Sequence, residues 1–543
     1  MLRQAMASRR ALLLLDGLDE GGEKRAQIER HVTEVLAPQG HVLLATSRPD
    51  GIDDERYAGF RRLELKPLSV DQQRQALEQR LGAERASSLL PYLERMPVDE
   101  RTQERITANP LMLSMVASIF ELRSGLAMPE TVVDLYTQAT AAMLGRAGGG
   151  TAGELAPLLQ AVFFEAQAAN QRVITEKHLR AAAQRVEDSE SALDLLRSLA
   201  LAERLPLLSL LQSRPLRLQS SHLSIQEYYA ARAICEGAVL PKRPWELPVF
   251  WANTVHLGLD MGDAFCQGLL RSSGKALQGP SVTARIRGDR HTSALALGAA
   301  VSAASQVEEV QVDRFAITLK KLQSETRMDL SQSKFSNLDL LVLGSFGPRG
   351  AGLIQLQTLM LRQQSVDADS MKAIASFITR LEISGEMGKQ KLRALGRALL
   401  SCSTGCLGSL KCSNFDLPKD ATTCDLARKV IGSDAAMLLA GVLKFNTILT
   451  HLEYAAHSSS VKSSCVSVLA LSLSLPLVCN LEPPLEPAPA SVRFCVSAID
   501  TPTLSLFPSC PFLACSIGGN RIGDEGASAL AAILKETKIT TLG

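Results

Sequence analysis

The chain has 543 residues, of which 46% are hydrophobic and 21% charged, so it is long enough for several globular domains. Its formal net charge of +2 argues against a broad nucleic-acid-binding surface. Aromatic residues make up only 4%, and a composition rich in leucine and alanine favours helices and repeats over a β-sandwich.

No segment of the sequence indicates export or a membrane span. The first aliphatic run ends at Asp16 after five residues, and a signal peptide needs about 7–15. No other apolar run reaches the ~18 residues of a transmembrane helix. The eleven cysteines match no common zinc-binding spacing, and their odd number favours free thiols in a reducing compartment. We therefore expect a cytoplasmic protein.

The segment Ala11 to Glu20, ALLLLDGLDE, predicts a strand of a parallel sheet. Its aliphatic residues run without alternation, which is typical of a strand buried on both faces. The run ends at Asp16, at the carboxyl end of the strand, where open α/β folds bind ligands. A carboxylate there could hold Mg²⁺ on a nucleoside triphosphate. Asp19 or Glu20 could then act as general base on the attacking water.

A second strand is predicted over His41 to Thr46, and Ser47-Arg48-Pro49 follows it. The stretch from Glu23 to Leu36 can form the helix that connects two parallel strands. Arg48, at the tip of the neighbouring strand, could sense a γ-phosphate. Aspartate and arginine also occur at ordinary strand ends, so it is the combination, roughly 30 residues apart, that favours a nucleotide site.

DGLDE followed by LLATSRP resembles the NACHT family of signalling ATPases, the STAND-type switches that include the NOD-like receptors. The resemblance implies ATP or ADP with Mg²⁺ as cofactors. The family has a glycine-rich loop with Lys-Ser/Thr before its metal-binding strand. The ten residues before this strand contain no glycine, so we expect an N-terminally truncated chain whose nucleotide binding is impaired. Gly17 stands where many such ATPases have a catalytic glutamate.

Two later motifs extend the resemblance. A short strand is expected from Phe60 up to Pro67, followed by a helix that Ser69 caps. Further on, Asn109-Pro110-Leu111 resembles the family's proline motif, which implies that Pro110 packs near the adenine. A proline that only interrupts a helix is the alternative.

The stretch SSHLSIQEYYAA, residues 220–231, resembles the family's winged-helix signature F-x-H-x-S-F-Q-E-Y/F. The resemblance implies that His222 contacts the β-phosphate of bound ADP. Imidazole suits this role because it donates hydrogen bonds and titrates near neutral pH. The alternative is a surface or core histidine without a ligand.

The last third contains repeats. Ile431 to Lys444 aligns with Ile522 to Lys535, and short L-x-x-L-x-L strands precede such helices. This unit is typical of leucine-rich repeats, here resembling the ribonuclease-inhibitor subtype with a period of about 28 residues. The two copies lie 522 − 431 = 91 positions apart, about 63 more than one period. We therefore predict that residues 455–515 are a disordered insertion, such as a translated intron.

The expected fold class is an α/β P-loop NTPase fragment with a partial parallel sheet, followed by α-helical and winged-helix domains and a C-terminal α/β leucine-rich-repeat solenoid. The expected boundaries are 1–65 (NACHT core without a phosphate loop), 66–127 (helical domain), 128–235 (winged-helix domain), 236–325 (second helical domain), 326–454 (leucine-rich repeats), 455–515 (insertion) and 516–543 (repeat continued).

The expected function is an ATP/ADP-regulated signalling switch whose repeats bind a protein or microbial ligand and which can self-oligomerise. No nucleic acid and no membrane span are expected. A nucleotide-independent leucine-rich-repeat scaffold is the alternative. An enzymatic ATPase of the AAA+ class is a third reading, which HLSIQEYY and the repeats disfavour.

Overall fold

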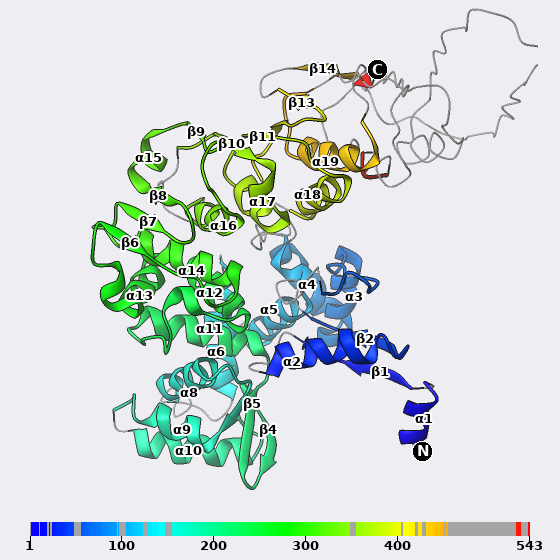
Figure 1. The fold of residues 1–543 in the computed structure, drawn as a ribbon. Helices are drawn as coiled ribbons and strands as arrows, with labels where there is room; N and C mark the ends of the chain where they lie inside the picture. The colour runs from blue at the N-terminus through cyan, green and yellow to red at the C-terminus, as the bar shows by residue number, and fades with distance from the viewer. Residues whose placement is uncertain are drawn as a thin grey trace, which may run out of the picture. The chain divides into compact units, whose positions relative to one another are not determined.

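The computed structural model is a mixed α/β fold with parallel and mixed sheets (Figure 1). It falls into two compact units, residues 1–323 with 341–354 and residues 324–340 with 355–543. The structure describes residues 2–9, 11–18, 21, 24–47, 56–63, 65–94, 96, 105–122, 129, 131–146, 155–187, 189–347, 355–402, 405–418, 422–425, 431–449, 451–453, 528–530, 532–533 and 541–542.

The first unit begins with helix α1 (Leu2–Ala7) and a two-stranded parallel sheet of β1 (Leu12–Leu15) and β2 (Val42–Ala45). Helix α2 (Arg25–Arg30) and a π-helical turn (His31–Leu36) connect the strands. The predicted pair of parallel strands with a helical crossover is therefore confirmed.

The prediction that the first strand is buried on both faces is wrong. Four aliphatic side chains on one face are exposed to more than half: Leu12 by 58%, Leu14 by 66%, Val42 by 60% and Leu44 by 51%. Leu12 lies opposite Val42 and Leu14 opposite Leu44, so the four form one patch. In the described residues nothing covers this face.

Helices α3 (Val70–Leu81), α4 (Ala83–Leu93) and α5 (Pro110–Leu122) follow. Ser69 caps α3 as predicted, because its hydroxyl accepts the Gln72 amide while the Gln72 side chain accepts the Ser69 amide. The short strand predicted before Pro67 is wrong for the described residues. Leu63 and Leu65 are 72% and 98% exposed there, and an extended segment becomes a strand only when another strand pairs with it.

A small antiparallel sheet lies between residues 155 and 235. In chain order the elements are helix, strand, two helices and two strands, and the sheet order is β3-β5-β4. The bounds are α6 (Val132–Arg146), α8 (Ala156–Ala168), β3 (Val173–Thr175), α9 (Glu176–Ala183), α10 (Ser189–Leu201), β4 (Leu208–Ser213), β5 (Leu216–Ser220) and α11 (Leu223–Cys235).

The region predicted as a second helical domain, residues 236–325, also contains a three-stranded sheet. Strand β6 pairs with β7 in parallel and β7 with β8 antiparallel, so strands accompany the helices in this region. Apolar residues alternate too briefly in these three-residue strands for a sequence pattern to reveal them. The bounds are α12 (Ala252–Asp260), α13 (Asp263–Ser273), β6 (Ser281–Thr283), α14 (Arg290–Ser302), β7 (Glu309–Gln311), β8 (Ala316–Thr318), α15 (Leu319–Ser324) and α16 (Asn337–Ser345).

The second unit contains a five-stranded sheet in the order β13-β12-β11-β10-β9. Its first four strands along the chain pair in parallel, and paired residues are 358 − 327 = 31, 380 − 358 = 22 and 409 − 380 = 29 positions apart. Strand β13 turns back antiparallel to β12. The bounds are β9 (Arg327–Asp329), β10 (Thr358–Arg362), α17 (Ala368–Ala375), β11 (Arg380–Ser384), α18 (Lys389–Ser401), β12 (Ser409–Lys411) and β13 (Asp416–Leu417).

Alternate side chains of these strands point into the core. Leu359, Leu361, Leu381 and Leu410 are fully buried, while the residues between them face the other side of the sheet. Helices α17 and α18 lie between successive strands along the chain and pack side by side (Figure 1). Strands therefore form at the predicted leucine positions.

A second parallel sheet, β14-β15-β16, ends the described chain. Its elements are β14 (Thr423–Asp425), α19 (Ser433–Leu443), β15 (His451–Glu453) and β16 (Thr541–Leu542). His451 pairs with Thr541 across 541 − 451 = 90 positions. Subtracting residues 455–515, which number 61, leaves 29, the same spacing as between β11 and β12. The predicted insertion itself lies outside the described residues.

In the part of the chain that the structure describes, no helix is long and apolar enough to cross a membrane. Among the described cysteines, Cys235, Cys266, Cys402, Cys406 and Cys412 are not joined by disulfide bonds.

Candidate functional site

Asp16 and Thr46 lie side by side where β1 and β2 end. The Thr46 hydroxyl donates to the Asp16 carboxylate at 2.5 Å and accepts the Gly17 amide at 2.9 Å. Parallel pairing brings the two together because both strands end at the same edge of the sheet. Asp16 is exposed at this edge, so its carboxylate is accessible to a cation.

Gly17 has a backbone role here. Its φ of 67° lies in the left-handed region, and the turn lets the Leu18 amide donate to the Thr46 carbonyl at 2.9 Å. A side chain at this position would cost about 1–2 kcal/mol. The local backbone therefore explains why glycine stands where the resembling ATPases have glutamate.

The remaining residues predicted for this edge, Asp19, Glu20 and Arg48, lie outside the described residues. Within the described ranges, no group of three or more His, Cys, Asp or Glu side chains is placed to hold a metal ion. Asp16, the predicted metal ligand, is thus the one predicted residue of this edge that lies within the described ranges.

Pro110 is the exposed first residue of α5. The Asn109 side chain caps the same helix by accepting the Leu111 amide at 2.9 Å. Proline is favoured at a first helical position because its missing N–H needs no partner there. Helix initiation alone is therefore sufficient to explain the Asn-Pro pair, while the adenine contact remains a prediction.

His222 is the N-cap of α11. Its Nδ1 atom accepts the Ser224 amide at 3.2 Å and lies 2.7 Å from the Ser224 hydroxyl. The Ser220 hydroxyl donates to the His222 carbonyl at 2.6 Å, which fixes the turn before the helix. The imidazole is half-buried at the positive end of a thirteen-residue helix, a position that favours anions.

The residues after His222 anchor α11 in the core. Gln226 donates to Gln167 of α8 at 2.9 Å, and Glu227 accepts from Asn253 of α12 at 2.7 Å. The motif residues Gln226 and Glu227 are therefore placed for packing and not for contact with a ligand.

Tyr228 extends this packing to α6. Its ring stacks on Tyr136 with centroids 5.2 Å apart, and its hydroxyl lies 2.8 Å from that of Thr137. Beside it, burial raises the pKa of Tyr229, which stacks on Phe163 of α8. One helix thus joins α6, α8 and α12, a role that the sequence motif did not indicate.

Each described candidate has a hydrogen bond in its own surroundings. Asp16 bonds to the neighbouring strand, the Asn109-Pro110 pair caps its own helix, and His222 bonds within its own turn.

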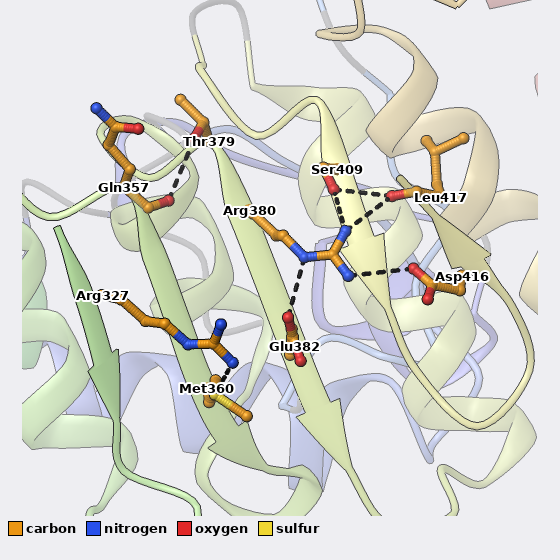
Figure 2. A network of polar contacts seen from close by, with 9 residues as sticks. All are labelled: Arg327, Gln357, Met360, Thr379, Arg380, Glu382, Ser409, Asp416 and Leu417. Atoms are coloured by element: carbon orange, nitrogen blue, oxygen red, sulfur yellow. Dashed lines mark hydrogen bonds and ion pairs between the residues drawn. The ribbon is translucent and has the colours of Figure 1, made fainter. Parts of the chain in front are cut away.

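A different set of polar residues gathers on the outer face of sheet β13-β12-β11-β10-β9 (Figure 2). Arg380 on β11 is the centre: it donates to Glu382 at 3.0 Å, to Ser409 at 2.7 Å and to Asp416 at 3.3 Å. Its side chain is only 17% exposed. Arg380 therefore ties three strands together and is neutralised by two carboxylates.

Around this network the same face carries exposed charges. Arg362 and Lys411 are exposed, and Arg327 lies 3.1 Å from the Met360 sulfur. Asp329 stays ionised because the Ser331 hydroxyl and amide hold its pKa below the ordinary value. The leucine pattern alone does not single out these residues, although every residue between two inward-facing leucines of a strand must face outward.

Neither protein-family models nor curated proteins match this chain.

Proposed function

We propose that this chain is a signalling protein of the NOD-like-receptor type, in which a nucleotide switch is joined to leucine-rich repeats that bind a protein or microbial ligand. The observation that carries the proposal is the strand end at Asp16 and Thr46. The parallel pairing of β1 with β2 brings Asp16 and Thr46, the described ends of the DGLDE and TSRP motifs, to one edge of the sheet, which supports a nucleotide site there.

Two further arrangements support it. The order helix, strand, two helices and two strands over residues 156–220 suits a winged-helix domain, and His222 follows its last strand at a helix N-terminus. In the second unit, strands with buried leucines recur at 22 to 31 positions with helices between them, as in leucine-rich repeats. The outer face around Arg380 would be the ligand-binding face.

Nucleotide binding decides between this proposal and its alternative, the nucleotide-independent scaffold. The scaffold is favoured by one observation, that the Nδ1 atom of His222 is already engaged by Ser224. The test is a titration of the purified chain with fluorescent ADP and Mg²⁺, beside His222→Ala and Asp16→Asn. Saturable binding that both substitutions weaken supports the switch.

The same titration has a second outcome. Residues 1–10 contain no glycine, and backbone amides of a glycine-rich loop normally hold the phosphates. For the 543-residue chain used in the titration we therefore expect a dissociation constant above about 100 μM. Absence of binding at any accessible concentration, with no shift in melting temperature by ADP, would favour the scaffold instead.

A further inference from the structure

The exposed face of the β1–β2 sheet is an apolar surface that a lone chain leaves in water. Leu12, Leu14, Val42 and Leu44 project from it, each more than half exposed. Parallel sheets are normally covered on both faces, and single exposed leucines are common whereas a contiguous aliphatic patch is not. The patch therefore marks an interaction surface.

The patch is flanked by opposite charges at its two ends. Asp16 lies at the carboxyl end of β1, on the same face as Leu12 and Leu14 by the alternation of the strand. At the other end the exposed Arg9 precedes β1, and its Nη1 atom lies 3.3 Å from the position of a Cβ on Gly40, just before β2. Among the residues that the structure describes, the sheet therefore has a basic side chain at one end and an acidic side chain at the other.

This polarity favours a second copy of the same chain as the occupant. If two copies stack face to face about a two-fold axis that lies in the plane of the interface and perpendicular to the strands, their strands run antiparallel across the interface. Leu12 and Leu14 of one copy then meet the same patch of the other, and Asp16 of each copy faces the basic end of its partner. An interface of this kind is self-complementary, as a two-fold dimer requires.

We propose that the chain forms such a dimer through the β1–β2 face, which assigns to the expected self-association a specific surface and an antiparallel arrangement. The four side chains expose on the order of 400 Å² per copy, about half of the ~800 Å² per partner of a standard interface. The aliphatic patch would form the dry centre and the charged ends its rim. The dimer is accordingly expected to be weak, with a dissociation constant on the order of 10 μM.

The test is sedimentation velocity of the full chain over a concentration series, with wild type, Leu14→Lys and Leu44→Lys. Both substituted side chains are already exposed, so the fold should persist, which far-UV circular dichroism checks. The matched control is Leu211→Lys on β4, which is 49% exposed but outside the patch. We expect at least a tenfold weaker dimer for the two patch variants and no change for the control.

Charge reversal tests the antiparallel arrangement. Asp16→Arg and Arg9→Asp should each weaken the dimer severalfold, and the double variant should restore it, because the opposed charges are exchanged together. A wild type that stays monomeric at all concentrations overturns the proposal, as does a dimer insensitive to Leu14→Lys and Leu44→Lys. Failure of the double variant to restore association overturns the antiparallel arrangement.

Discussion

At the scale of single residues, two arginines of the same sheet show that burial decides how much a side chain's hydrogen bonds and ion pairs contribute to stability. Arg380 is mostly buried and bonds to Glu382, Ser409 and Asp416, whereas Arg362 on the next strand is exposed and bonds to Gln332. Exposed ion pairs contribute little, but removal of one partner from a desolvated network leaves the others unpaired.

Arg380→Ala should therefore lower the free energy of unfolding by about 1–3 kcal/mol. The loss arises because Glu382 and the hairpin strand β13 lose their common donor. Urea denaturation followed by circular dichroism measures it. Arg362→Ala is the control and should change stability by less than about 0.5 kcal/mol. Equal effects of the two substitutions would mean that the network does not hold the strands together.

His178 makes stability depend on pH. It is buried at the start of α9, where its Nδ1 atom accepts the Thr175 amide, and burial lowers its pKa from the ordinary 6.5. Below pH 6.5 this histidine becomes protonated in the unfolded chain, while in the folded chain it stays neutral down to its lower pKa. The free energy of unfolding therefore falls on acidification.

The expected pH profile follows from the lowered pKa of His178 in the folded state. The contribution of His178 to stability is complete above pH 6.5 and declines as the pH falls from there toward that lowered pKa. Melting temperatures from pH 7.5 to 5 measure the decline. The matched variant His178→Gln, which keeps an acceptor for the Thr175 amide, should show a shallower decline. An identical profile in the two proteins would assign the pH dependence to other groups.

At the scale of elements, α18 and α19 pack closely against each other, and two glycines permit the approach. A Cβ on Gly396 would lie 2.6 Å from the backbone nitrogen of Leu438, and one on Gly441 would lie 2.7 Å from the Cβ of Leu399. Backbone atoms cannot move aside as a flexible side chain can. The close packing of the two helices therefore requires glycine, which has no side chain, at these positions.

Gly396→Ala should destabilise the protein by about 1–3 kcal/mol because it forces the two helices apart. Gly388→Ala, at the N-cap of the same helix, provides the control. It has no neighbour within 4 Å of the added Cβ and a φ of −66°, so it should be nearly neutral. A neutral Gly396→Ala, measured in the same chemical denaturation experiment, would contradict close packing of α18 on α19.

At the scale of the whole molecule, the spacing of paired strands bears on the role of residues 455–515. The β15–β16 pair has the spacing of a single repeat once these 61 residues are subtracted.

Deletion of residues 455–515 should therefore leave the fold intact, with a melting temperature equal to or above that of the full chain, because a shorter connection costs less entropy to close. Amides of Thr541 and Leu542 that stay protected from hydrogen exchange would show that β15 and β16 still pair. A melting temperature lowered by several degrees would mean that the segment contributes to the fold.

Local sequence signals were sufficient where the interaction spans few residues. Ser69 caps α3 as predicted, and Gln72 completes a capping box with it, because both partners lie in one turn of chain. The leucine pattern located β10, β11 and β12 because alternation of inward and outward side chains is a property of each strand alone. It did not indicate β9 or β13, which contain no such pattern. The three-residue strands β6, β7 and β8 were too short to carry such a pattern.

The sequence by itself determined the parallel pairing of β1 and β2, the cap at Ser69 and the recurring strands of the second unit, because aliphatic runs, capping residues and periodicity act locally. Only the tertiary structure decided that one face of β1–β2 lies open, that His222 caps its own helix, and that Arg380 binds Asp416 on a strand that turns back. These outcomes depend on which distant segments pack together, and solvent exposure, unlike periodicity, belongs to the assembled fold and not to any one stretch of sequence.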